Sequence, residues 1–313
     1  MKLFLALLTS LTLSAAASAA QPLLSPSELQ SRLQDTTVRV IDIRDPQSYA
    51  AGHIAGAVNA PYGQWRGPAN NPGELPALPK LTALVQSLGL TPASHAVVVS
   101  SGADTTDFGG SARVYWTLKV LGLKELSILN GGVKAWAQAG LPQGTQAVKV
   151  AASSFSPKID ASLIATKEDL VQHIKSGDAT LVDARPAAFF LGQTRHASAK
   201  LPGTLQGAVH LDNGKWFTPG TSSFAATDQA RQVAASSPLN PAQETVSFCN
   251  TGHWAATNWF AMSEVLGQKN VKLYPGSMVD WTQDANALPM DNVPGRIEQL
   301  AIDAKLWAGK TFN

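Results

Sequence analysis

The stretch that decides the fold is VRVIDIRDP, residues 38–46. It starts as an apolar, β-branched run and turns polar at its end, which is typical of a buried strand that leads into a loop. A second stretch of the same form, TLVDARP, occupies residues 180–186. Asp42 and Asp183 hold the same place in the two stretches, 141 residues apart. The chain therefore carries one strand-and-loop signal in each half.

Further matches follow in the same order in both halves, and ordered matches of this kind indicate an internal duplication. The separation between matched residues changes along the chain, from 141 to 151 and then to 145 residues, so the second copy has a longer loop after its first strand. The matched pairs are Arg44 with Arg185, residues 56–58 with 207–209, and residues 131–136 with 276–281.

Each copy alternates short apolar runs with helical stretches. This alternation predicts the α/β class, with two tandem domains that each hold a parallel sheet with helices on both faces. Residues 143–157 are small, polar and without a periodic pattern, so we expect the linker there. The expected strands are residues 38–43, 96–99, 179–183 and 245–248, the expected helices are residues 112–121 and 255–266, and the expected domains are residues 21–145 and 146–313.

The composition is that of a globular protein. At about 150 residues per domain, the 313 residues correspond to two domains. Hydrophobic residues make up 44% of the chain and charged residues 15%, which is too apolar for a disordered chain. The formal net charge is +2. A charge so close to zero gives no reason to expect a nucleic acid or a membrane surface as a partner.

The first twenty residues are typical of a secretory signal peptide. Lys2 supplies a positive start, residues 3–13 form an apolar run, and residues 14–20 are all small. The apolar run is too short to cross a bilayer as a helix. We therefore expect cleavage after Ala19 or Ala20, export to a periplasm, and no membrane insertion of the mature protein.

Cys249 is the one cysteine of the chain and cannot form an internal disulfide. It follows the expected strand 245–248 and opens the loop CNTGHW, residues 249–254. Ligands of parallel α/β sheets bind at the carboxyl ends of the strands, where Cys249 stands. The loop amides and the start of the next helix, near Ala255, favour negative charge at that point. These features predict a thiolate nucleophile at neutral pH.

The chain resembles the tandem-domain rhodaneses, sulfurtransferases of the thiosulfate or 3-mercaptopyruvate type, over almost its whole length beyond residue 20. The resemblance implies a ping-pong reaction, in which Cys249 takes a sulfane sulfur from a small anionic donor as a persulfide. Cyanide, a thiol or a partner protein then accepts that sulfur. It implies neither a metal nor an organic cofactor. The motifs that carry it are residues 42–45, 52–57, 130–136, 183–185, 207–208 and 273–281.

The resemblance also implies the other residues of the site. Arg185 would bind the anionic donor through its fork of N–H donors, with a structural salt bridge as the alternative. Thr251 would offer a hydroxyl to the donor or the persulfide. From its own chemistry, His253 would stabilise the thiolate if protonated, or pass a proton to a leaving group, with a side chain that points to solvent as the alternative. The loop residues expected around the sulfur are Asn250, Thr251, Gly252, His253, Trp254 and Ala255.

The first copy is expected to be catalytically inactive. Ser101 is the residue expected at the place of Cys249, 148 residues earlier, and a serine cannot carry a persulfide. By the resemblance, this first domain helps to wall the active site. His53, Trp65 and Arg66 are candidates for that wall, and a structural role in its Gly-His-Ile turn is the alternative for His53.

Several alternatives stay open or are weighed against the thiosulfate interpretation. By the resemblance, members that prefer thiosulfate carry basic residues directly after the cysteine, where this chain has Asn250 and Thr251, so 3-mercaptopyruvate is the alternative donor. Of the loop typical of 3-mercaptopyruvate members, only Gly252 is shared. A cysteine-dependent phosphatase is disfavoured, since its loop needs an arginine. A metal site is disfavoured because Cys249 and His253 are too few ligands. A non-catalytic sulfur carrier would use the same cysteine and stays open.

Overall fold

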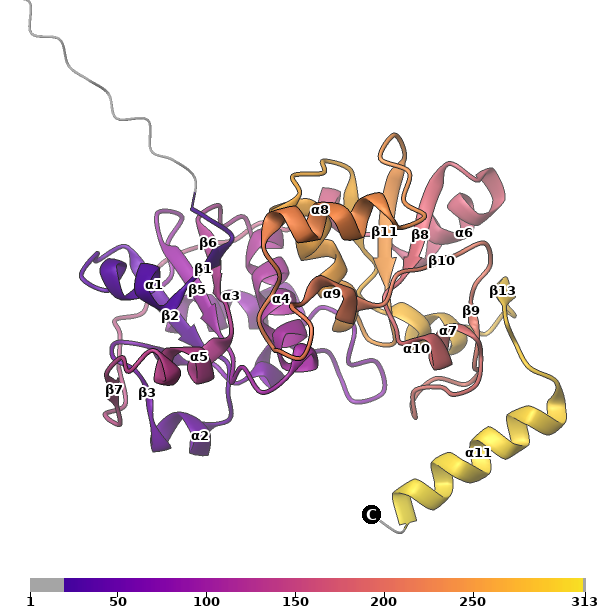
Figure 1. The fold of residues 1–313 in the computed structure, drawn as a ribbon, viewed down its shortest axis with the longest axis horizontal. Helices are drawn as coiled ribbons and strands as arrows, with labels where there is room; N and C mark the ends of the chain where they lie inside the picture. Colours follow the sequence, from indigo (N-terminus) through magenta and orange to yellow (C-terminus); the bar gives the residue numbers. More distant parts are fainter. Residues whose placement is uncertain (1–19, 312–313) are drawn as a thin grey trace, which may run out of the picture.

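The computed structural model describes residues 20–311. The predicted signal peptide, apart from Ala20, lies outside the described residues. Two α/β domains lie side by side, the first running from indigo to magenta and the second from pink to yellow (Figure 1). Each is built around a sheet of parallel strands, so the predicted fold class is confirmed.

The first domain holds a five-stranded parallel sheet with the strand order β1-β6-β5-β2-β4. A separate antiparallel pair joins β3 to β7. The strands are β1 (Leu23–Leu24), β2 (Val38–Asp42), β3 (His53–Ile54), β4 (Val58–Asn59), β5 (His95–Val99), β6 (Leu126–Leu129) and β7 (Gln143–Gly144). The helices are α1 (Pro26–Arg32), α2 (Pro46–Ala51), the 3₁₀ turn η1 (Tyr62–Trp65), α3 (Leu78–Ser87), α4 (Thr105–Val120) and α5 (Gly132–Gln138).

The second domain holds a four-stranded parallel sheet with the order β10-β8-β11-β12, and β9 pairs with β13 in antiparallel fashion. The strands are β8 (Ala179–Asp183), β9 (Thr204–Leu205), β10 (Val209–His210), β11 (Glu244–Phe248), β12 (Val271–Leu273) and β13 (Met290–Asp291). The helices are η2 (Ala161–Leu163), α6 (Lys167–Ser176), α7 (Ala187–Phe190), η3 (Asn213–Trp216), α8 (Thr227–Ala235), α9 (Trp254–Trp259), the π-turn η4 (Phe260–Val265), α10 (Ser277–Thr282) and α11 (Arg296–Thr311).

The strands of the first sheet are buried on both faces, as a parallel sheet requires. Along β5, Val97 and Val99 enter one core together with side chains of α1 and α5. Val98, between them, enters the other core together with side chains of α3 and α4. Helices therefore cover both faces of this sheet, which explains why the strands are continuous apolar runs in the sequence.

The sequence predicts the strands more closely than the helices. Each of the four predicted strands is present within one residue of its expected ends. The predicted helix 255–266 is present as α9 and the π-turn that continues it. The predicted helix 112–121 is longer, because α4 starts at Thr105. Its first turn is polar and is capped by the Asp104 carboxylate, which accepts a hydrogen bond from the Asp107 amide at 2.8 Å, so apolar periodicity does not reveal it.

Helices α4 and α9 lie against each other where the two domains meet (Figure 1). Phe108 of α4 packs on Phe217, Phe224 and Phe260 of the second domain, with ring centroids 5.3, 5.3 and 5.7 Å away. One core cluster contains side chains from both domains. The interface is therefore a continuation of the two cores, and it holds the domains in a fixed relation.

Residues between β7 and η2 form the connection between the domains without regular secondary structure. At the other end, α11 extends along the outside of the second domain (Figure 1). Its Ile302 is buried, whereas Ile297 is 83% exposed. None of the helices within residues 20–311 is both long and apolar enough to cross a membrane.

Candidate active site

Cys249 directly follows β11 and stands at the carboxyl edge of the second sheet. Strand β11 lies between β8 and β12 in the middle of that sheet. The thiol is 1% exposed. The next residues form the predicted loop and lead into α9, which begins at Trp254. The cysteine, the loop and the helix therefore stand in the arrangement that the sequence predicts.

Ser277 holds the loop from behind. Its hydroxyl oxygen accepts hydrogen bonds from the amides of Cys249 at 3.0 Å and Gly252 at 3.1 Å, and its proton is donated to the Tyr274 carbonyl at 2.9 Å. Ser277 is fully buried and has a φ of 55°, an uncommon conformation for a residue with a side chain. In the sequence, Ser277 stands out only as part of the matched stretch 276–281, so its role at the site is a finding of the structure.

Gly252 is required at its position in the loop. Its φ is 67°, and a Cβ there would lie 2.5 Å from Arg113 Nη1 and 2.6 Å from the Pro275 carbonyl oxygen. The Gly252 carbonyl accepts a hydrogen bond from Arg113 Nη1 at 3.4 Å. A larger residue would clash with both neighbours, so glycine allows the two domains to close on the loop.

The first domain contributes side chains to the loop from η1 and α4. Arg66 Nη2 donates to the Thr251 carbonyl at 2.9 Å, as expected for a residue of the wall. The Tyr62 hydroxyl lies 2.8 Å from His253 Nδ1. Arg113 is the third contributor, and neither Tyr62 nor Arg113 is among the residues that the sequence predicts for the site. Nothing in their local sequence marks them, because their role depends on how α4 packs against α9.

His253 bridges the two domains as a neutral ring. Its Nε2 lies 2.7 Å from the Thr106 carbonyl oxygen, which can only accept, so Nε2 carries the proton. Its Nδ1 then accepts the hydrogen bond from Tyr62. Burial and the positive charge of Arg66 lower the pKa of His253 to about 4. At neutral pH the ring is uncharged, so it does not stabilise the thiolate as a cation. Both ring nitrogens are already hydrogen-bonded, and proton transfer by His253 stays a prediction.

Arg185 lies beside the loop and is bound to the carboxylate of Asp183. Its Nε donates to Asp183 Oδ1 at 2.8 Å, and its Nη2 donates to the Gly203 carbonyl at 2.7 Å. Its Nη1 donates to Asn250 Oδ1 at 3.3 Å. The structural salt bridge is therefore present, and through Asn250 it reaches the loop. Donor binding by Arg185 stays a prediction.

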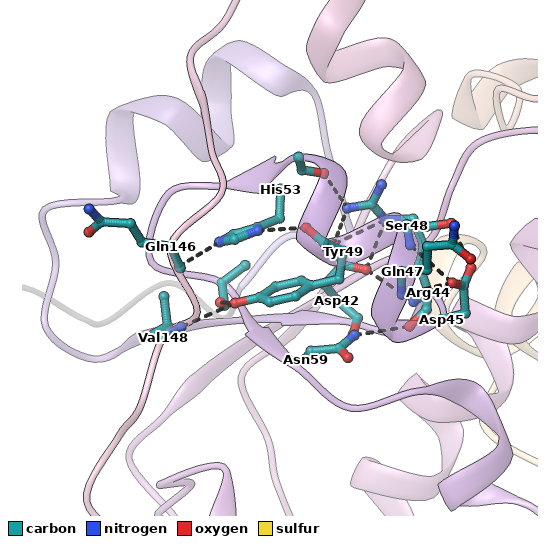
Figure 2. Close-up of polar contacts among 12 residues, drawn as sticks. Asp42, Arg44, Asp45, Gln47, Ser48, Tyr49, His53, Asn59, Gln146 and Val148 are labelled. Carbon is teal, nitrogen blue, oxygen red and sulfur yellow. Dashed lines mark hydrogen bonds and ion pairs between the residues drawn. The ribbon is translucent and has the colours of Figure 1, made fainter.

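The first domain repeats this ion pair where no cysteine is present. Figure 2 shows the Arg44 guanidinium on the Asp42 carboxylate, with Nε 3.0 Å from Oδ1. Its Nη2 donates to the Gly52 carbonyl at 2.7 Å, as the matching atom of Arg185 does to Gly203. The ion pair therefore orders the loop after β2 in the first domain and the loop after β8 in the second.

His53 and Trp65, two wall candidates, lie within the first domain. Both ring nitrogens of His53 lie near carbonyl oxygens, Nδ1 at 2.8 Å from Tyr49 and Nε2 at 3.1 Å from Gln146 (Figure 2). His53 thus fastens the connection between the domains. The Trp65 indole donates to the Ala60 carbonyl at 3.1 Å and is fully buried. Of the two roles expected for His53, a place in the wall of the active site or a structural role, these contacts support the structural one.

The remaining predicted residues surround Cys249 in different ways. Asn250 and Thr251 are buried, 4% and 9% exposed. The Ala255 carbonyl accepts a hydrogen bond from the Ser247 hydroxyl at 3.0 Å, which ties the start of α9 to β11. The Trp254 indole donates to Thr106 Oγ1 at 3.3 Å and therefore packs against the first domain. Their contacts with a donor stay predictions.

Strand pairing corrects the residue that stands in place of Cys249 in the first copy. Asp42 pairs with Val99, and its counterpart Asp183 pairs with Phe248. The residue after Val99 is Ser100, so the predicted Ser101 is wrong by one residue.

Backbone hydrogen bonds give the same alignment. The Val133 amide donates to the Ser100 carbonyl at 2.9 Å, as the Met278 amide does to the Cys249 carbonyl at 3.1 Å. The error arises because the separation between the copies changes along the chain, to 149 residues at this point. The place of the thiol is still held by a serine.

A duplicated α/β domain with one buried cysteine in a strand-to-helix loop defines the class of this protein. The family model "Rhodanese-like domain" matches residues 25–139 and 166–284, and the chain belongs to this family. The two matches correspond to the two halves of the duplication. The resemblance inferred from the sequence motifs is therefore confirmed.

Three relatives place the chain more closely. It is 26% identical over 295 residues to a putative thiosulfate sulfurtransferase of Synechococcus elongatus, covering 90% of this chain and 89% of the relative. It is 29% identical over 260 residues to a thiosulfate sulfurtransferase of Pseudomonas aeruginosa, covering 82% and 93%. It is 26% identical over 272 residues to a sulfur carrier protein of Thermus thermophilus, covering 83% and 93%.

Solved structures share the fold. A 3-mercaptopyruvate sulfotransferase of Escherichia coli superimposes with a TM-score of 0.72 at 22% identity, covering 82% of this chain and 99% of that chain. An anaerobic ergothioneine biosynthesis enzyme of Chlorobium limicola superimposes with a TM-score of 0.77 at 18% identity, covering 87% and 71%. At these identities the likeness establishes the fold of both domains together.

Replacing Ser277 should destabilise the loop. Ser277→Ala leaves the buried amides of Cys249 and Gly252 without their acceptor, so we expect the free energy of unfolding to fall by about 2 kcal/mol or more. Ser277→Gly also removes the hydroxyl but relieves the positive φ, so it should cost about 1 kcal/mol less. Urea unfolding measures both variants. Wild-type stability in Ser277→Ala would contradict the bracing role.

His253 should make stability depend on pH. Its pKa is about 4 in the folded protein and 6.5 in a free side chain, so the unfolded chain takes up the proton first as the pH falls. The free energy of unfolding should therefore fall between about pH 6.5 and pH 4, by about 3 kcal/mol at most, and should keep this contribution above that range. His253→Gln keeps a donor for Thr106 and should flatten the curve. Urea unfolding from pH 7 to pH 4 compares the two, and parallel curves would refute the assignment.

Proposed function

We propose that this protein is an exported sulfurtransferase that moves a sulfane sulfur from thiosulfate to cyanide or a thiol through a persulfide on Cys249. The observation that carries the proposal is the buried Cys249 in its braced loop at the carboxyl edge of the second sheet. Membership of the rhodanese-like family and relatives named thiosulfate sulfurtransferases support the same reaction class.

The reaction balances with Cys249 as the only covalent group. The thiolate attacks the outer sulfur of thiosulfate, the S–S bond of the donor breaks, and sulfite leaves with the electron pair. The charge is conserved, because a thiolate and a dianion become a persulfide anion and a sulfite dianion. A nucleophile such as cyanide then attacks the outer persulfide sulfur, forms thiocyanate and restores the thiolate. No metal or organic cofactor takes part.

The braced loop suits both steps. The Ser277 hydroxyl holds the Cys249 and Gly252 amides, so the loop keeps its curvature while the charge on sulfur changes. The neutral His253 ring accepts a hydrogen bond from Tyr62 at Nδ1 and donates one to Thr106 from Nε2, so it braces the loop against the first domain. Such a preorganised loop stabilises an anionic sulfur without reorganisation during the reaction.

Substitution of the cysteine tests the mechanism. Cys249→Ser should abolish persulfide formation and thiosulfate:cyanide turnover, because an alkoxide does not form at neutral pH and cannot hold a sulfane sulfur. Ser100→Ala, the matched change in the first domain, should leave turnover within about twofold of wild type. Intact-mass spectrometry after mixing with thiosulfate detects the added sulfur, and cyanide should remove it. Turnover retained in Cys249→Ser would refute the mechanism.

Two narrower alternatives have specific support. The fold is shared with a 3-mercaptopyruvate sulfotransferase, and the loop has no arginine or lysine, so 3-mercaptopyruvate is the second candidate donor. A relative named a sulfur carrier protein makes a carrier role the second candidate function. Persulfide formation with one donor but not the other separates the donors. A persulfide that forms but passes to neither cyanide nor small thiols would favour the carrier.

Export is also part of the proposal. Lys2, the apolar run 3–13 and the small residues 14–20 support an N-terminal signal peptide. Expression of the full chain in a Gram-negative host should deliver a periplasmic protein that starts at Ala20 or Gln21. Cell fractionation and N-terminal sequencing measure this outcome. An intact N-terminus in the cytoplasmic fraction would contradict it.

A further inference from the structure

Two arginines of the first domain approach the cysteine loop without a carboxylate partner. Arg113 is completely buried and donates from Nη2 to the Gly73 carbonyl at 2.7 Å and from Nη1 to the Gly252 carbonyl. Its Nε has no hydrogen-bond partner. Arg66 donates from Nη2 to Thr251, and its buried Nη1 also has no partner. Within residues 20–311, no ion pair joins either guanidinium to an acidic side chain.

A buried charge without a counter-charge is costly, so guanidinium groups without a carboxylate partner favour an anion beside them. Burial and the neighbouring Arg66 lower the pKa of Arg113 to about 9, so it still carries its charge at neutral pH. The groups that act in the opposite direction are the side chains of Tyr62 and Cys249. Of these two, Cys249 belongs to the second domain, so Arg113 lies within electrostatic range of the cysteine across the domain boundary.

The duplication provides an internal comparison. Helices α4 and α9 start 149 residues apart, at Thr105 and Trp254, so Arg113 of α4 corresponds to Met262 of the second domain. The turns η1 and η3 start 151 residues apart, so Arg66 corresponds to Phe217 of the second domain.

The matched positions of the two domains therefore differ in charge. Phe217 packs on Phe108 of the first domain, and Met262 is buried in the same core. Arginines of the first domain stand where the second domain has these two apolar residues. A purely structural clamp would not require this difference.

Other sources of positive charge at the cysteine are already occupied. The loop residues after Cys249 include no arginine or lysine, and His253 is neutral at neutral pH. Arg185 is paired with Asp183. Among the described residues, Arg66 and Arg113 are therefore the basic side chains that contact this loop without a carboxylate partner.

We propose that Arg66 and Arg113, from the domain that lacks the cysteine, form the anion-attracting half of the Cys249 site and select a dianionic donor of the thiosulfate type. The choice of donor rests on the proposed function, whereas the attraction of anions does not. In the transfer written above, the pair stabilises the dianion that arrives and the sulfite dianion that leaves. The first domain is thus a part of the active site and more than a wall.

Paired alkylating reagents test the charge without relying on sulfur transfer. Iodoacetate and iodoacetamide have nearly the same size and alkylate the same thiol, but iodoacetate is an anion, so access to the buried sulfur cancels in the ratio of their rates. Arg66→Met and Arg113→Met should each lower the iodoacetate-to-iodoacetamide ratio about fivefold, as loss of a nearby unit charge predicts. Lys119→Met, which removes an interdomain cation paired with Glu264, should leave the ratio unchanged.

The same variants test donor selection. Each should reduce kcat/KM for persulfide formation from thiosulfate about tenfold, mainly through KM, and from 3-mercaptopyruvate by less, while sulfite becomes a weaker inhibitor. Arg66→Lys should recover most of the alkylation ratio because it keeps the charge. If Arg113→Met fails to fold, the partly exposed Arg66 carries the test alone.

The outcomes separate this inference from the proposed function. Unchanged alkylation ratios in Arg66→Met overturn the anion-attracting role, whatever the enzyme transfers. Lower ratios together with an equal loss of both donors overturn the selection of a dianion. A wild-type protein that forms no persulfide from either donor contradicts the proposed function and leaves the alkylation result to stand by itself.

Discussion

The packing of α4 against α9 is the contact on which the site depends. Phe108 sits among three phenylalanines of the second domain, and this apolar contact holds Arg113, on the same helix, against the loop of Cys249. Gly252 allows the approach because a Cβ would collide with Arg113. If the two helices separated, the loop would lose the carbonyl contacts that the first domain provides. Burial of apolar surface thus supports the polar geometry of the site.

The loop is held from two sides that belong to different domains. Ser277 binds its amides from the second domain, and Arg66 and Arg113 bind its carbonyls from the first. Because the two groups of a peptide unit point in opposite directions, fixing the carbonyl also fixes the amide. The curvature of the loop is therefore set by the pair of domains, so the domain without a cysteine has a direct part in shaping the loop.

The duplicated motifs show how one structural unit serves two purposes. Asp42 with Arg44 and Asp183 with Arg185 form the same ion pair in both domains, so this pair is a device for ordering a loop. The loops that follow β5 and β11 differ in chemistry, with Ser100 in one and Cys249 in the other. Two further matched positions also differ in chemistry, because Arg66 and Arg113 of the first copy correspond to Phe217 and Met262 of the second.

The sequence alone determined the α/β class, the duplication, the four central strands and the place of Cys249 at the end of one of them. These features follow from local patterns, because apolar runs, turn residues and matched motifs lie close together along the chain. Even so, local matching placed the serine of the first copy one residue too late, since the separation between copies drifts and only strand pairing corrects it. Tertiary structure alone decided the roles of Ser277, Tyr62 and Arg113. Those residues lie far from Cys249 in sequence and meet its loop through packing, which leaves no local signal.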